Sequence, residues 1–279
     1  MSFRVIVDSC GELTQEMKDS GCFINVPLTI MLGDYHIVDD ETFDQADFLK
    51  RVEEYPDCPK TSCPSPEKYM ESYRCDADHI YAVTLSANLS GSYNSAVLGK
   101  NLYEEEYGDK PIYVFDSRSA SVGQTLIALK IAECEEAGMT FQQVVETVEK
   151  FITEQITYFV LESLEALRKN GRLTGMKALV ATALNIKPYC GATPEGTIFQ
   201  VGQARGIKKA LSKMVDVFVT ELKNSEEKIV AISHCNCFER ALEVKRMIEA
   251  KITPKKIIML DTRGISSTYA SNGGIIVSG

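Results

Sequence analysis

The sequence HIYAVT at residues 79–84, followed by LSANLSGSYNSA at residues 85–96, decides the fold class. Its first six residues are mostly β-branched or aromatic, which predicts a strand. The hydroxyl-rich residues that follow lead into a segment with helical periodicity, so a polar loop joins a strand to a helix. Strand followed by helix, repeated along a chain, is typical of α/β domains.

Comparable strand-like runs alternate with helical segments along the rest of the chain. They predict strands at Phe3–Val7, Phe23–Ile30, Pro111–Phe115, Thr157–Leu161, Lys228–Ser233 and Lys256–Leu260. Residues typical of helix starts precede three of the helical segments: Thr42 with Gln45, Ser65 with Pro66, and Thr140 with Gln143. The chain is therefore expected to adopt an α/β fold.

Two turn signals divide the fold further. Leu32-Gly33-Asp34 predicts a small hairpin, and Thr193-Pro194-Glu195-Gly196 predicts a second hairpin between two apolar runs. The second half of the chain therefore looks more antiparallel than the first. We expect two domains: residues 1–155 with a mainly parallel sheet flanked by helices, and residues 156–279 with a mixed or antiparallel α/β arrangement.

Composition excludes several classes of function. The 279 residues carry a formal net charge of −9 and show no basic stripe, so nucleic-acid binding is not expected. No apolar run approaches the ~20 residues that cross a bilayer, so stable membrane insertion is not expected either. Nine cysteines without a secretory pattern at the start predict reduced thiols and a cytoplasmic protein.

Two hydroxyl-rich loops form the strongest candidate site. They are TSCPSP at residues 61–66 and TLSANLSGSYNSA at residues 84–96, and each is predicted to open a helix. Neither contains an acid, a base or a histidine. An anion held there must be held by hydroxyls and by backbone N–H groups at helix N-termini, which indicates binding rather than catalysis.

Three predicted strands end in an acid followed by a hydroxyl residue: Asp8-Ser9, Asp116-Ser117 and Asp261-Thr262. One interpretation is a polar rim at the carboxyl ends of parallel strands, with Asp8 or Asp116 serving a phosphotransfer or hydrolytic enzyme. The other is that these side chains cap the turns that follow. The sequence leaves both open.

Other catalytic and metal motifs are missing. The run His234-Cys235-Asn236-Cys237 has the wrong spacing for a zinc site and no Cys-x-x-Cys partner, so no metal site is predicted. The nucleophile elbow of serine hydrolases and the phosphate-binding loop of nucleotide hydrolases are also absent from the sequence. We therefore predict no catalytic residues and no cofactor.

Two cationic turns and one aliphatic segment have two interpretations each. Arg172 and Arg205 could each clamp a carboxylate or phosphate, whereas Arg172 could also be a helix C-terminal cation with Gly171 as its C-cap residue. The segment Leu161–Leu184 is rich in Leu, Met, Val and Ala. It reads as core, and such a lining also suits a long alkyl chain.

Taken in order, the motifs of this chain resemble the DegV family of bacterial fatty-acid-binding proteins, and the resemblance covers nearly the whole sequence. The individual motifs are short, but their order is specific. They are Val7-Asp8-Ser9, Thr61-Ser62 followed by Pro64-Ser65-Pro66, Leu89-Ser90-Gly91-Ser92-Tyr93 with Ser95-Ala96, Phe115-Asp116-Ser117 before Ser121-x-Gly123, Leu161-Glu162-Ser163-Leu164, Asn170-Gly171-Arg172-Leu173, Lys187-Pro188 and Arg205-Gly206-x-Lys208-Lys209.

The resemblance implies one long-chain fatty acid buried at the domain junction, with its carboxylate near Thr61 and Ser90. It also implies that the protein carries the ligand and presents it to a separate ATP-binding fatty acid kinase subunit. A fatty-acid sensor without a kinase partner is the alternative. The ligand-binding residues expected on this basis are Thr61, Ser62, Ser90, Gly91, Ser92 and Arg205.

The chain departs from the family pattern at two positions. Ala270 stands where the family has a histidine near the C-terminus, and Asn170 replaces the first glycine of a Gly-Gly-Arg motif. Because Thr61, Ser62 and Ser90 are retained, acyl binding is still expected. Alanine has no polar group, so Ala270 cannot perform whatever that histidine does at the head group.

Overall fold

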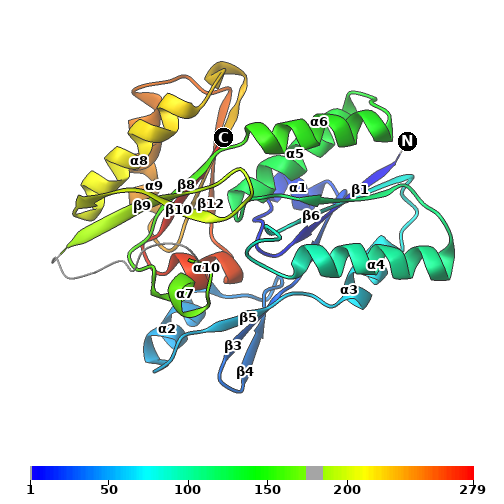
Figure 1. Cartoon of the computed structure of the whole chain (residues 1–279), viewed down its shortest axis with the longest axis horizontal. Helices are drawn as coiled ribbons and strands as arrows, with labels where there is room; N and C mark the ends of the chain where they lie inside the picture. The colour runs from blue at the N-terminus through cyan, green and yellow to red at the C-terminus, as the bar shows by residue number, and fades with distance from the viewer. Residues whose placement is uncertain (1, 174–184) are drawn as a thin grey trace.

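The computed structural model describes residues 2–173 and 185–279, and within them the strands form three sheets (Figure 1). The first sheet is parallel throughout, in the order β2-β1-β6-β7, which confirms the parallel N-terminal sheet. Its strands are β1 (Phe3–Asp8), β2 (Phe23–Val26), β6 (His79–Thr84) and β7 (Ile112–Asp116).

Helices cover both faces of this sheet because its strands are apolar on both sides. Alternate residues such as Val5 and Tyr81 pack on one face against α5 (Val122–Glu136) and α6 (Phe141–Glu154). The other face packs on two further helices, which are α3 (Pro66–Tyr73) and α4 (Ser92–Tyr107).

The second sheet is mixed, in the order β10-β9-β8-β13-β11-β12, which confirms the arrangement expected for the C-terminal half. Only β11 and β12 run parallel; the other pairs among the described strands are antiparallel. The strands are β8 (Thr157–Val160), β9 (Ile186–Ala192), β10 (Ile198–Arg205), β11 (Ile229–His234), β12 (Lys256–Asp261) and β13 (Ile275–Ser278).

One face of the mixed sheet packs on α8 (Ile207–Glu221) and α9 (Phe238–Glu249). Its other face meets α5, where Val122 and Leu126 contact Ala231 and its neighbours. Helix α5 therefore lies between the two sheets and belongs to the core of both. The division at residues 155 and 156 stays a prediction.

A small antiparallel sheet, in the order β4-β3-β5, corrects part of the sequence interpretation. The single strand predicted at Phe23–Ile30 is two strands in different sheets, because Pro27 has no N–H to continue the ladder. The hairpin at Gly33 is confirmed, with that glycine at φ +62°. The strands are β3 (Thr29–Leu32), β4 (Tyr35–Val38) and β5 (Lys60–Ser62).

Helix starts were predicted with mixed success. The capping box of Thr140 and Gln143 is confirmed, and α3 begins at Pro66 as expected. The start at Thr42 is wrong: Asp44 caps α2, while the Thr42 hydroxyl donates to Asp40 Oδ1 at 2.6 Å. The remaining elements are α1 (Gln15–Asp19), α2 (Gln45–Glu54), α7 (Glu165–Lys169), η1 (Ser225–Glu227) and α10 (Gly264–Ala270).

The C-terminal helix α10 joins the two halves, since it contacts α2, β3 and α7 (Figure 1). The fully buried carboxylate of Asp39 holds its first turn by accepting from the N–H groups of Gly264 at 2.8 Å and Ile265 at 2.9 Å. A carboxylate at a helix N-terminus satisfies free donors and complements the helix dipole. Residues far apart in sequence thereby meet around one cavity.

None of the helices within residues 2–173 and 185–279 combines the length and apolar character that crossing a membrane requires.

Candidate functional site

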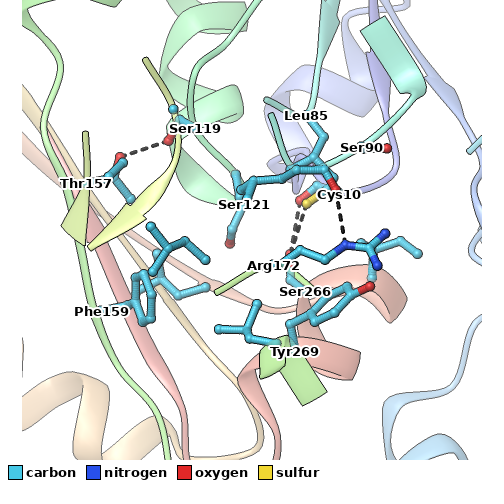
Figure 2. A pocket seen from close by; sticks show the side chains of 18 of the residues that line it. Cys10, Leu85, Ser90, Ser119, Ser121, Thr157, Phe159, Arg172, Ser266 and Tyr269 are labelled. Atoms are coloured by element: carbon cyan, nitrogen blue, oxygen red, sulfur yellow. Dashed lines mark hydrogen bonds between the residues drawn. The ribbon is translucent and has the colours of Figure 1, made fainter. Parts of the chain in front are cut away.

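One cavity lies where α10, the loops after β6 and β7, and the inner face of the mixed sheet converge (Figure 2). Its empty space, mouth included, is about 840 Å³. The residues that line it are Cys10, Leu28, Thr61, Leu85, Leu89, Ser90, Arg118, Ser119, Ala120, Ser121, Thr157, Phe159, Leu161, Leu167, Arg172, Ala192, Gly196, Thr197, Ile198, Ile265, Ser266, Tyr269, Ala270 and Ile276.

The body of the cavity is apolar. Phe159 lies on β8, Leu161 directly follows that strand, Ile276 comes from the neighbouring β13, and Leu167 approaches from α7. Part of the aliphatic segment predicted to suit an alkyl chain thus lines the cavity, through Leu161 and Leu167. Leu164 and Leu173 pack against the same apolar cluster, and the other aliphatic residues of the segment, Met176, Leu179, Val180, Ala183 and Leu184, lie outside the described residues.

One end of the cavity carries a cation and hydroxyls, which we call the arginine end: Thr61, Ser90, Arg172 and Tyr269 (Figure 2). Thr61 Oγ1 and Tyr269 Oη are hydrogen-bonded at 2.8 Å. The Arg172 guanidinium lies 5.8 Å from the centre of the Tyr269 ring, and its Nε donates to Leu89 O at 3.2 Å. Burial raises the pKa of Tyr269 and keeps the phenol neutral.

The opposite end carries Ser119 and Thr157, which lie away from Arg172 and Tyr269 in Figure 2. We call this the hydroxyl end. Ser119 Oγ and Thr157 Oγ1 are 2.8 Å apart, and Thr157 Oγ1 lies 2.9 Å from the hydroxyl of Ser278. These hydroxyls tie the loop after β7 to two strands of the mixed sheet.

Between the two ends, a buried carboxyl backs the cavity wall. Ser121 lines the cavity at φ +55° and its hydroxyl donates to Glu12 Oε2 at 2.8 Å. Burial raises the pKa of Glu12 from its usual 4.5 to about 7, and hydrogen bonds from Ser266 and Ser121 oppose the shift. Since Glu12 is 1% exposed, this carboxyl belongs to the wall.

The structure brings only part of the predicted ligand set to this cavity. Thr61 and Ser90 line it, whereas Ser62 and Gly91, the residues that follow them, are exposed and do not line it. Ser92 is fully buried, donates to Asp8 Oδ2 at 2.6 Å and bonds the Tyr69 hydroxyl at 2.6 Å. Ser92 therefore supports the β1 end of the first sheet, two residues away from a serine that faces the cavity.

Arg205 also lies away from this cavity. It ends β10 with its side chain exposed, beside Lys208 and Lys209 in a separate surface depression. The physical reason is the register of β10, where the buried position falls on Ala204 and its neighbour must face solvent. A contact between Arg205 and a ligand stays a prediction.

Two of the acids at the strand ends, Asp8 and Asp116, accept hydrogen bonds from backbone N–H groups of neighbouring loops. Asp8 is fully buried and accepts from the N–H groups of Leu85 at 2.7 Å and Cys10 at 3.2 Å, in addition to two side chains. Burial raises its pKa. Asp116 accepts from the N–H groups of Ala87 and Arg118. These contacts favour the capping interpretation over a phosphoryl acceptor.

The cysteine and histidine residues show no metal geometry. In the described part of the chain, no three His, Cys, Asp or Glu side chains are grouped so as to hold a metal ion. His234 Nδ1 lies 3.2 Å from Asp261 Oδ1, and burial raises the pKa of both Cys235 and Cys237. Burial thus keeps both thiols protonated.

The sequence missed Tyr269, Ser119 and Thr157 as cavity residues and weighed Arg172 without deciding. Ala270 lines the cavity with its methyl group and is 1% exposed, so the position that holds a histidine in the family pattern contributes no polar group here. The hydroxyl-rich run of residues 266–269 was the available signal. Only the packing of α10 shows that Tyr269, the last residue of this run, meets Thr61.

Comparisons with known proteins agree with this architecture. The family model described as "Uncharacterised protein, DegV family" matches residues 2–278. A DegV domain-containing protein of Streptococcus gordonii is 31% identical over 280 residues, which cover 99% of this chain and 98% of the relative.

Solved structures agree as well. The crystal structure of a DegV family protein from Ruminococcus gnavus, refined with vaccenic acid, is 61% identical with a TM-score of 0.98 and full coverage of both chains. The Streptococcus pneumoniae Fatty Acid Kinase (Fak) B3 protein loaded with linoleic acid is 30% identical with a TM-score of 0.87, covering 100% of this chain and 99% of that one. The chain belongs to the DegV family.

Proposed function

We propose that this protein binds one long-chain fatty acid in the cavity, with the carboxylate at the arginine end and the acyl chain along the apolar body. The observation that carries the proposal is a cavity with an apolar body whose arginine end brings Arg172 together with the hydroxyls of Thr61, Ser90 and Tyr269. Relatives solved with vaccenic and linoleic acid support it.

Arg172 is well suited to a carboxylate. A guanidinium has five N–H donors. Two of its nitrogens donate to Leu89 O and Asn170 O, which fix the side chain against the loop after β6. The donors that remain can bind a carboxylate with a charge-assisted hydrogen bond, supported by the hydroxyls of Ser90 and Tyr269. The cradle expected from hydroxyls alone thereby gains a cation.

Apolar burial provides most of the binding free energy. Removing about fourteen methylenes from water at ~0.8 kcal/mol each gives on the order of 11 kcal/mol before the costs of association. Those costs are several kcal/mol, so micromolar to nanomolar affinity follows without a second ionic contact. The head group then sets the orientation of the ligand more than its affinity.

We further propose that the protein acts as a carrier without catalytic residues, with the ligand at the junction of residues 1–155 and 156–279. The Fak B3 relative supports presentation of the fatty acid to a separate kinase subunit. Because Ala270 supplies no imidazole, such presentation must rely on Arg172 and Tyr269 at the head group. Arg205, Lys208 and Lys209 form a basic surface for contact with an acidic partner.

Native mass spectrometry of the purified protein tests the binding proposal, because a co-purified fatty acid adds its mass to the folded chain. Delipidated protein should then bind hexadecanoic or octadecenoic acid at micromolar concentration or below. Failure of both measurements contradicts the proposal.

An assay for acyl phosphate with the kinase subunit of the same organism separates the carrier from a fatty-acid sensor. A carrier supports ATP-dependent formation of acyl phosphate from the bound ligand. A sensor binds the fatty acid and yields none.

A further inference from the structure

The side-chain amide of Asn170, two residues before Arg172, ties the end of α7 to the N-terminal half of the chain. Asn170 Nδ2 lies 3.0 Å from both Pro59 O and Ala166 O. Cys58 Sγ is farther away, at 3.4 Å. An amide nitrogen carries two protons, and a thiol is only a weak acceptor. One proton therefore goes to Ala166 O within the helix, and the other crosses to Pro59 O.

Few polar contacts hold this helix end against the N-terminal half. Among the described residues, the hydrogen bonds between residues 163–173 and residues 2–155 come from the side chains of Asn170 and Arg172 alone. Leu167 packs in an apolar cluster with Leu49, but apolar burial is non-directional. The bond from Asn170 to Pro59 O thus orients the turn without using the guanidinium.

The two segments that this bond joins carry the head-group residues. Pro59 directly precedes β5, on which Thr61 lies hydrogen-bonded to Tyr269 at 2.8 Å. On the other side, the main-chain oxygen of Asn170 accepts from Arg172 Nη1, and the guanidinium lies beside the Tyr269 ring (Figure 2). The position of Asn170 therefore sets where the guanidinium lies relative to Thr61.

We propose that Asn170 is a positioning residue for the fatty-acid carboxylate, because its amide holds Arg172 close enough to Thr61 for one carboxylate to meet both. This inference rests on the proposed function, since it assumes the carboxylate at the arginine end. Asn170 does not itself line the cavity, so it acts through Arg172. Loss of the bond to Pro59 O leaves the apolar body intact and weakens only the recognition of the charged head group.

Competition binding of hexadecanoic acid and hexadecanol measures that recognition, because the two ligands share the chain but not the charge. Asn170→Ser is the sharper variant. A serine hydroxyl near a helix end can bond the carbonyl four residues back, so it keeps the bond to Ala166 O and loses the bond to Pro59 O. The acid-to-alcohol affinity ratio should fall about fivefold in Asn170→Ser and in Asn170→Ala, an effect within the range of one hydrogen bond.

Ser163→Ala is the matched control on the same helix. It removes the hydroxyl that accepts from the N–H of Glu165 at the start of α7, and Ser163 does not line the cavity. A general loosening of α7 would lower the affinity for acid and alcohol together. The ratio should therefore stay at its wild-type value in Ser163→Ala.

A double-mutant cycle assigns the effect to Arg172. In an Arg172→Ala background, adding Asn170→Ser should change the ratio by less than about twofold, because the group that Asn170 positions is gone. A fall of the same size in that background overturns the proposal, as does a ratio that stays within about twofold of wild type in both single Asn170 variants. If hexadecanoic acid fails to bind the unmodified protein, the proposed function fails; if it binds and both Asn170 variants keep the ratio, only this inference fails.

Discussion

Both ends of the cavity carry hydroxyl side chains, but these hydroxyls make different contacts at each end. At the arginine end, Thr61 bonds a phenol and lies beside a cation that has donors to spare. At the hydroxyl end, Ser119 and Thr157 hydrogen-bond each other, and Thr157 also bonds Ser278 of the mixed sheet. A hydroxyl residue therefore says little about a ligand until its neighbours are known.

The largest expected effect is on the unfolding free energy and comes from Glu12, the buried carboxyl behind the cavity wall between the two ends. Because the folded protein holds the Glu12 proton up to a pKa of about 7 and the unfolded chain releases it near 4.5, the Glu12 contribution to stability is complete below pH 4.5. It is lost as the pH rises to 7, by about 3 kcal/mol. Glu12→Gln should remove this loss.

Urea unfolding of both proteins at pH 4.5, 6 and 7.5 measures the effect. The difference in unfolding free energy between wild type and Glu12→Gln isolates this group from other buried carboxyls, such as Asp8 and Asp39, whose pKa values burial also raises. A difference that stays constant across the range would show that the wall holds no neutral carboxyl.

Removing the Arg172 cation should take away the charge that distinguishes the arginine end from the hydroxyl end. Arg172→Ala is expected to weaken fatty-acid binding by roughly 10- to 100-fold, because a hydrogen bond to a charged group contributes about 1.5–3 kcal/mol. Arg168→Ala, on the exposed side of α7, is the matched control. Isothermal titration with hexadecanoic acid measures both. Equal affinities for the two variants would place the carboxylate elsewhere.

Ser90 and Ser92 sharpen the comparison within one loop. Ser92→Ala should lower the unfolding free energy by about 1–3 kcal/mol, because Asp8 loses a buried donor, and should leave binding affinity almost unchanged. Ser90→Ala should do the reverse, with a few-fold loss of affinity and little change in stability. Thermal melts and titrations of both variants check this. Identical profiles would mean that the two serines share one role.

Tyr269→Phe should have the smallest effect. The ring stays beneath Arg172, and the phenol hydroxyl is lost together with its hydrogen bond to Thr61 and its proposed contact with the carboxylate, so affinity should fall only about twofold to threefold. A competition assay with a fluorescent fatty acid is sensitive enough to measure it. An unchanged affinity would remove the phenol from the head-group contacts.

These contrasts also explain what sequence alone could predict. Parallel and mixed sheets follow from local pattern, since a buried strand such as β6 and a capping box such as Thr140 with Gln143 are short-range features. The break at Pro27 was visible but its consequence was not, because strand membership in different sheets is a long-range property.

The site was predicted only in part for the same reason. Thr61 and Ser90 reach the cavity, whereas Ser92 turns to Asp8 because helix α4 starts between them. Tyr269 could not be found from spacing. It enters the site only because Asp39 anchors α10 against the N-terminal half, 225 residues away along the chain.

The orientation of the bound fatty acid tests the central claim most directly. A crystal structure of the delipidated protein soaked with hexadecanoic acid should show the carboxylate within about 3 Å of the Arg172 guanidinium, with the terminal methyl next to Ser119. A carboxylate found at Ser119 and Thr157, with the methyl group beneath Arg172, would contradict the account.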